Sequence, residues 1–286
     1  MQIPRFWTAV EGKESTPKGG VIELRVFGWS DTSIAEARKV GLEKLSRLAE
    51  RVRSGADFPA RYLYDNRPIR EEILQELRDP AGATEAFVTR NAYGAEVLNT
   101  ARLFFADVDD VPIRPTNFFM ALKFAFGGRP TIPDDTTDIP ASIRSFAESN
   151  ASWCFRVYRT KAGWRVIVTH ELFDPVSERT LQMLQALGSD PNYVRLTKAQ
   201  QSFRARLTPK PWRCRVKQPK RTFPREEDAA QREHDAWLKK YDAASANYAT
   251  CRFVTTLGRG RDCDAARRMI ELHDRTTRAD SKLALA

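Results

Sequence analysis

The sequence is poor in the residues on which several common chemistries depend. Its 286 residues include only four cysteines and three histidines. Cys154, Cys214, Cys251 and Cys263 form no C-x-x-C pair, which argues against a zinc site or a disulfide framework and favours reduced thiols in a cytoplasmic protein. No serine-hydrolase elbow, zinc-protease motif or Walker phosphate loop is present either.

Long apolar runs are also missing. No segment reaches the roughly 18 consecutive apolar residues that suggest a membrane-spanning helix. The first residues, MQIPRFWTAVEGKE, lack the apolar stretch of a signal peptide. We therefore expect no membrane partner and a cytoplasmic location, and nothing in the sequence indicates an oligomeric state.

Positive charge is abundant. The formal net charge is +10, and 42% of the residues are hydrophobic, enough to build a folded core. A basic folded protein favours polyanionic partners, so we expect nucleic acid or nucleotides. A basic protein without such a partner is the alternative.

Hydrophobic patterning predicts an α+β fold. We expect a mixed or mainly antiparallel sheet core flanked by helices, with a helical C-terminal portion, because the strands pair locally by hairpins. The expected strands are 21–30, 86–92, 101–107, 153–160 and 164–170; the expected helices are 34–52 (opened by a capping box at Ser33), 69–79, 116–126, 140–150, 177–188, 226–258 and 264–275.

The composition suggests three parts. Residues 1–84 form an N-terminal strand–helix segment packed on the core, residues 85–210 the α+β core with a metal site, and residues 211–286 a basic linker with the helical C-terminal portion.

In the stretch RLFFADVDDVP (102–112), an apolar strand leads directly to three aspartates, Asp107, Asp109 and Asp110. Because strand residues alternate, Asp107 and Asp109 share one face, about 7 Å apart. Such carboxylates suit Mg²⁺ or Mn²⁺ and thus phosphoryl or nucleotidyl transfer. Two alternatives stay open: the aspartates face solvent, or they pair with arginines such as Arg90 or Arg165.

The hairpin around residues 158–170 offers cations for phosphate. Arg159, Lys161 and Arg165 are the candidate phosphate-binding residues of a nucleotide site, and His170 is a candidate catalytic residue. A turn glycine at Gly163 and a structural histidine are the simpler interpretations.

Residues 191–225 contain eleven basic residues and no acidic one. Basic and aromatic side chains interleave here, a mixture that can follow a phosphate backbone and stack on bases. The candidate nucleic-acid contacts are Arg204, Arg206, Lys210, Trp212, Arg213 and Arg215. A solvated basic surface is the alternative.

The strand ending in Asp107-x-Asp109, followed by Gly163-Trp164-Arg165, resembles the archaeo-eukaryotic primase superfamily of primase-polymerases. The resemblance implies a nucleotidyltransferase in which Asp107 and Asp109 hold Mg²⁺ or Mn²⁺. Arg165 stands where members commonly have histidine, and His170 fits that motif loosely. Asp190 or Asp174 would supply the third acidic motif.

FFADVDDV also resembles the first motif of haloacid dehalogenase phosphatases, with Thr169 similar to the second. That resemblance implies Asp107 as nucleophile and Asp109 as acid/base. A non-catalytic nucleic-acid-binding protein is the other alternative.

Overall fold

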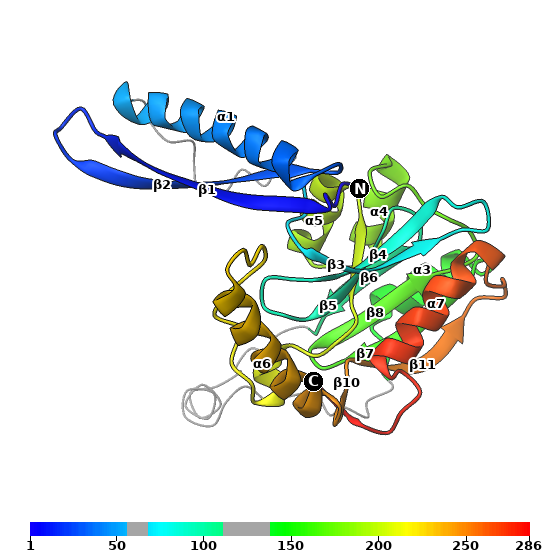
Figure 1. Cartoon of the computed structure of the whole chain (residues 1–286). Coiled ribbons are helices and arrows are strands. Elements are labelled where there is room, and N and C mark those ends of the chain that lie inside the picture. Colours follow the sequence, from blue (N-terminus) through cyan, green and yellow to red (C-terminus); the bar gives the residue numbers. More distant parts are fainter. Residues whose placement is uncertain (56–67, 111–137) are drawn as a thin grey trace, which may run out of the picture.

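The computed structural model describes residues 1–55, 68–110 and 138–286 (Figure 1). The strands are β1 (Phe6–Ser15), β2 (Val21–Ser30), β3 (Glu72–Arg78), β4 (Thr84–Arg90), β5 (Glu96–Thr100), β6 (Phe104–Asp109), β7 (Phe155–Thr160), β8 (Gly163–Val168), β9 (Phe203–Arg206), β10 (Tyr248–Ala249), β11 (Cys251–Leu257) and β12 (Ala284–Leu285). The helices are α1 (Ile34–Arg53), α3 (Ala141–Ser149), α4 (Glu178–Leu187), α5 (Pro191–Gln200), the 3-10 helix η1 (Pro211–Cys214), α6 (Asp228–Ser245) and α7 (Asp264–Thr277). The predicted α+β class is confirmed.

One four-stranded sheet has the order β11-β7-β8-β6, and all its neighbours are antiparallel. The central strand β8 is buried along its whole length, as expected for a strand covered on both faces. β6 forms one edge and ends at the aspartates. Its register on β8 places Asp107 directly opposite Arg165.

The second sheet has the order β3-β4-β5-β9 and is also antiparallel. Its edge strand β9 belongs to the basic segment 191–225. Both sheets contribute to one apolar core, in which the Phe104 ring of β6 lies 5.3 Å from the Phe203 ring of β9, between centroids. The core thus joins the acidic strand to the basic segment.

The β1–β2 hairpin and α1 form an arm that projects from the two sheets (Figure 1). The Ser33 hydroxyl accepts the Glu36 backbone N–H at 3.2 Å, which confirms the predicted start of the helix. The helix crosses β2 closely at Gly28, where an added Cβ would lie 1.9 Å from the Ala37 carbonyl oxygen. A side chain at Gly28 would therefore force the helix off the hairpin.

Two predictions of secondary structure were wrong. The segment 69–79 contains β3 rather than a helix, and residues 251–257 of the expected helix 226–258 form β11 at the sheet edge. In both places a partner strand, the adjacent β4 or the distant β7, takes the backbone hydrogen bonds and overrides local helix preference. The predicted helix 116–126 lies outside the described residues.

α6 and α7 confirm the helical C-terminal portion. None of the helices in the described ranges has both the length and the apolar character needed to cross a bilayer.

Candidate anion-binding site

Asp107 is paired with a buried arginine. Arg165 donates from Nε to Oδ1 at 2.8 Å and from Nη2 to Oδ2 at 3.1 Å. The Arg165 side chain is only 1% exposed, so it needs a carboxylate partner to offset the cost of burying its charge. This is the arginine pairing left open above. Arg90, the other arginine named there, bonds to Glu96 instead.

Asp110 has the same arrangement with Arg159. Two hydrogen bonds of 2.9 and 2.8 Å join the groups, and Arg159 Nη1 also donates to the Gly163 carbonyl at 2.6 Å. The Arg159 side chain is likewise 1% exposed. Arg159 and Arg165 were predicted to contact a triphosphate, but both guanidinium groups point inward and are occupied by aspartates.

His273 lies behind the Asp107–Arg165 pair, and no sequence pattern pointed to it. Its Nε2 is 3.2 Å from Arg165 Nη1, and its Nδ1 is 2.8 Å from Asp274 Oδ1. A ring that donates Nδ1–H to Asp274 presents the Nε2 lone pair to the arginine and is neutral. Burial lowers the pKa of His273 and favours that form.

Asp109 is the aspartate of the three that is exposed. Partial desolvation and the nearby carboxylates of Asp190 and Asp107 raise its pKa, whereas Lys210 opposes the rise. Asp190 is held there because its backbone N–H donates to the Asp107 carbonyl at 3.2 Å and its side chain caps α5. Of the two candidates for the third acidic motif, the structure brings Asp190 to the site. Asp174 instead caps a turn at Val176.

A two-ion metal site is not supported by these donors. Both oxygens of Asp107 accept hydrogen bonds from Arg165, and Oδ1 of Asp190 accepts the Asn192 backbone N–H at 3.0 Å. Within the ranges that the structure describes, no group of three or more His, Cys, Asp or Glu residues is arranged to hold a metal ion. Among the described residues, neither oxygen of Asp109 accepts a hydrogen bond.

The structure does not bring His170 to the aspartates. The register pairs Val168 of β8 with Phe104 at the start of β6, so His170 follows the opposite end of the strand pair. Its ring stacks on Trp153 with 4.6 Å between centroids, and its Nε2 lies 3.2 Å from Glu171. The antiparallel direction of the two strands explains this separation, and the contacts are those of a structural histidine.

Three basic side chains, Arg206, Lys210 and Arg213, gather beside Asp109; we call them the basic cluster. Burial lowers the pKa of each. Arg206 further lowers the pKa of both Lys210 and Arg213. In the described part of the chain none of the three has a carboxylate oxygen within 4.0 Å. Among the described residues the cluster is therefore a concentration of like charge with no carboxylate in ion-pair contact, and Asp107 and Asp109 act on it only at longer range.

Arg206 carries the least satisfied group of the basic cluster. Its Nη1 is buried and has no hydrogen-bond partner among the described residues. Buried donors are nearly always paired, and leaving one unpaired costs about 1–3 kcal/mol. An oxygen of a phosphate or carboxylate ligand would satisfy this donor and offset the charge of the cluster.

An exposed aromatic side chain borders the basic cluster. Trp212 on η1 is 47% exposed, and its ring packs edge to face on Tyr93 with 5.4 Å between centroids. Lys210 Nζ lies 5.6 Å from the Trp212 ring centroid. An exposed indole fixed from one side and flanked by cations is suited to stack on a nucleic-acid base.

The other predicted cations have different places. Arg204 donates to both oxygens of Glu71, at 2.6 and 2.7 Å, and so serves the fold. Arg215 is exposed and ends η1 in the left-handed conformation, with φ of 61°. Lys161 lies in the turn between β7 and β8. The predicted contacts that meet at the basic cluster are Arg206, Lys210, Trp212 and Arg213.

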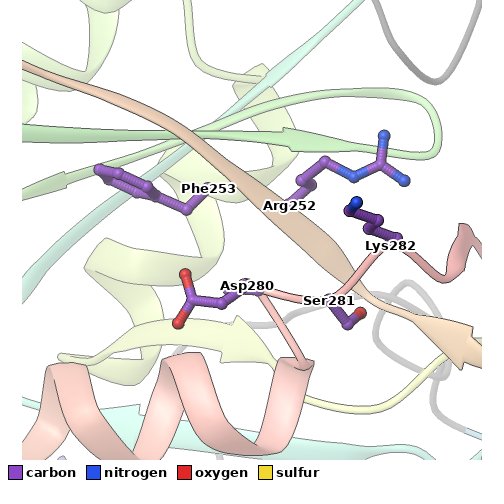
Figure 2. A pocket seen from close by; sticks show the side chains of 6 residues that line it. Arg252, Phe253, Asp280, Ser281 and Lys282 are labelled. Atoms are coloured by element: carbon purple, nitrogen blue, oxygen red, sulfur yellow. The ribbon is translucent and has the colours of Figure 1, made fainter.

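A separate hollow of about 500 Å³ lies between β11 and residues 279–282 (Figure 2). The side chains of Arg252 and Lys282 lie next to each other on one side of it, whereas Asp280 lies on the other side. Its lining contains none of the predicted site residues, and its mixed charges single out no ligand.

No family model, curated protein or solved structure matches this chain. The resemblances to primase-polymerases and to phosphatases therefore stay predictions, and function is argued from the site.

Proposed function

We propose that the chain binds single-stranded nucleic acid without a metal ion. The basic cluster contacts the phosphates, and Trp212 stacks on a base. The observation that carries the proposal is the buried, unpartnered Nη1 of Arg206 within a group of cations that has no carboxylate partner in the described ranges. A phosphate oxygen supplies both the missing acceptor and the missing charge.

The pairing of the neighbouring aspartates supports this role. Asp107 and Asp110 are matched by their own arginines, so their charge is largely compensated inside the protein. Asp109 is the exposed carboxylate nearest the cluster, and the fold already raises its pKa. The net charge of +10 adds a favourable field for a polyanion.

Stacking favours a single strand over a duplex. Every base presents a π-face once it is unstacked, and contact with an aromatic side chain is worth about 1–3 kcal/mol per base. Trp212 is exposed enough to make that contact. Tyr93 supports it from the side. Stacking of this kind does not choose a base, so we propose affinity for single strands with little sequence preference.

Fluorescence anisotropy with labelled single-stranded and duplex oligonucleotides, at several salt concentrations and with or without EDTA, tests the proposal. We expect tighter binding of the single strand, a negative slope of log K against log salt, and no effect of EDTA. Lys210→Ala or Arg213→Ala should reduce the size of that slope by about 0.7 each.

Lys39→Ala, an exposed charge on α1, is the matched control and should leave the slope unchanged. Equal slopes for all four proteins, or affinity lost on adding EDTA, would contradict the proposal.

A second candidate is a metal-dependent nucleotidyltransferase that holds Mg²⁺ or Mn²⁺ beside Asp109. The observation in its favour is the raised pKa of Asp109, which is caused by partial burial and by repulsion from the negative charges of Asp190 and Asp107. A divalent cation would relieve that repulsion.

Calorimetric titration of Mn²⁺ with a nucleoside triphosphate separates the two candidates. The variant to compare is Asp109→Asn, because it leaves the Asp107–Arg165 pair in place. A saturable heat that the variant loses supports metal binding, whereas equal heats remove it. No observation favours the phosphatase alternative, since both oxygens of its nucleophile, Asp107, accept hydrogen bonds from Arg165.

A further inference from the structure

The arm has an open strand edge at β2. Among the described residues its sheet contains only β1 and β2, and α1 packs on both strands. At the outer end of the arm, Val21 is 67% exposed. An open edge of this kind offers unpaired backbone N–H and C=O groups to another strand.

The hairpin register shows which backbone groups of β2 face outward. The Thr16 N–H donates to the Gly20 carbonyl at 2.7 Å, which makes these two a hydrogen-bonded pair. Because antiparallel pairs alternate, even-numbered residues of β2 then bond to β1 and odd-numbered residues face away. The outward-facing residues are Val21, Glu23, Arg25 and Phe27.

Two observed contacts agree with this alternation. Lys44 Nζ donates to the outward carbonyl of Phe27 at 3.2 Å. On β1, the outward N–H of Ala9 donates to Glu226 at 2.7 Å. By contrast, the outward backbone groups of Val21, Glu23 and Arg25 have no hydrogen-bond partner among the described residues.

We infer that β2 of a second copy of this chain pairs with this edge, antiparallel, with a two-fold axis beside Leu24. Glu23 of each copy then lies opposite Arg25 of the other. Glu23 and Arg25 both face outward, so they form the hydrogen-bonded pairs, and Leu24 meets Leu24 in the intervening non-bonded position. Val21 meets Phe27 at each end, and a carbonyl has two lone pairs, so the Phe27 oxygen can accept a second bond beside that of Lys44.

Charge selects this register. Within one copy, Lys13 lies 3.3 Å from Glu23 and Arg25 lies 3.3 Å from Glu11, all on the face away from α1 and all largely exposed. Joining two copies about Leu24 extends each pair into a four-strand row of alternating sign. The row reads Lys13 and Glu23 from one copy, then Arg25 and Glu11 from the other. Cross-strand pairs of opposite charge stabilise a sheet, and like charges destabilise it.

Neighbouring registers lose these contacts. An axis beside Arg25 would place Arg25 opposite Arg25, and an axis beside Glu23 would place Glu23 opposite Glu23. On the α1 side, the register about Leu24 also brings Ile22 opposite Val26, which joins apolar side chains. The inference concerns the arm and does not depend on nucleic-acid binding.

Sedimentation equilibrium on the full chain and its charge variants tests the dimer. Glu23→Arg places two arginines opposite each other at both ends of the interface, and Arg25→Glu does the same with glutamates. We expect each single variant to raise the dimer Kd at least about 10-fold. The double variant Glu23→Arg with Arg25→Glu restores opposite charges and should recover most of the affinity.

Lys18→Glu at the tip of the hairpin is the control, and circular dichroism checks that every variant folds. A native chain that stays monomeric up to about 1 mM overturns the inference. A dimer that none of the variants weakens, or a double variant no better than the singles, overturns it as well.

Disulfide trapping tests the register itself. A mixture of Glu23→Cys and Arg25→Cys chains should cross-link on oxidation more than either chain alone, because the new thiols face each other only across the mixed pair. The native chain, oxidised in parallel, controls for its own four cysteines. Equal cross-linking by the mixture and the separate chains would contradict the register about Leu24.

Discussion

Two groups of basic side chains near the end of β6 differ in one respect. Arg159 and Arg165 are almost fully buried, and each holds an aspartate through two hydrogen bonds. Arg206, Lys210 and Arg213 are partly buried, and in the described ranges no carboxylate pairs with them. The first group stabilises the fold, whereas the second carries positive charge that no carboxylate among the described residues contacts directly.

The comparison shows that a basic residue is a binding candidate when the fold leaves it unmatched. Arg204 belongs to the same basic segment as Arg206, two positions away on β9, yet it is matched by Glu71. Proximity in sequence therefore says little about the role. The presence or absence of a nearby carboxylate decides it, because an uncompensated buried charge is costly unless something else supplies the counter-charge.

The largest expected effect comes from breaking an ion pair of the matched group, by which we mean Arg159 and Arg165 with their aspartates. Asp107→Ala leaves Arg165 buried without a counter-ion, and we expect the free energy of unfolding to fall by about 3 kcal/mol. The value is at the low end of the usual range because the Asp107 side chain is 37% exposed. Urea denaturation measures it. Asp109→Ala is the control and should change stability by about 0.5 kcal/mol or less; similar losses for both would remove the contrast between the aspartates.

Gly163→Ala tests how closely β8 must approach the acidic strand. An added Cβ would lie 2.2 Å from the Val108 carbonyl oxygen, so backbone has to move and the Asp107–Arg165 register is disturbed. We expect a loss of about 2 kcal/mol in thermal or urea unfolding. Gly20→Ala is the matched control, since its nearest contact there is Thr16 Oγ1 at 3.3 Å. Equal stability of the two variants would show that Gly163 is a turn glycine and nothing more.

Arg206→Met separates stability from binding. The change removes a buried charge and an unpartnered N–H while keeping an unbranched side chain, so the free energy of unfolding should stay the same or rise by about 1 kcal/mol. Affinity for single-stranded nucleic acid should fall about 10-fold, since that factor corresponds to about 1.4 kcal/mol of lost phosphate contact. Urea unfolding and anisotropy measure the two quantities. A strongly destabilised variant would show that Arg206, like Arg159 and Arg165, stabilises the fold.

The smallest effect concerns pH. The folded chain raises the pKa of Asp109 above its ordinary value of 3.8, so folding favours the protonated form. Stability from this group is present below pH 3.8 and is lost as pH rises through the higher folded value. The native and Asp109→Asn chains should therefore be closest in stability at low pH. Near neutral pH the free energy of unfolding of the variant should exceed that of the native chain by less than about 1 kcal/mol. Urea unfolding at pH 3.5 and pH 7 measures this, and a gap that narrows with rising pH would contradict it.

Much of the local structure could be predicted from residues close together in the sequence. The alternating strand at 21–30, the strand at 164–168 of the predicted 164–170, the Ser33 cap and the Gly188 stop of α4 are confirmed. Each depends on a period or a cap that spans a few residues. The segment 69–79 was misassigned because its apolar spacing also fits a helix, and only β4 makes it a strand.

For the site, the sequence predicted which charged residues are present but not how they are grouped. The aspartates at the end of β6 and the basic segment near Lys210 were identified from the sequence. The prediction that His170 lies with the aspartates was wrong, and His273 was not identified as part of the site. Both outcomes depend on strand direction and on a helix, α7, more than 100 residues away in the chain. No local pattern encodes those distances.

The sequence by itself determined the fold class, the apolar strand that ends in aspartates, and the excess of positive charge after residue 190. Only the tertiary structure decided which of these charges are matched. The physical reason is that pairing requires a carboxylate and a guanidinium to meet at hydrogen-bond distance. Here the register of β6 on β8 sets that distance for Asp107 and Arg165, whereas within the described ranges no carboxylate meets Arg206 at that distance and its Nη1 has no partner.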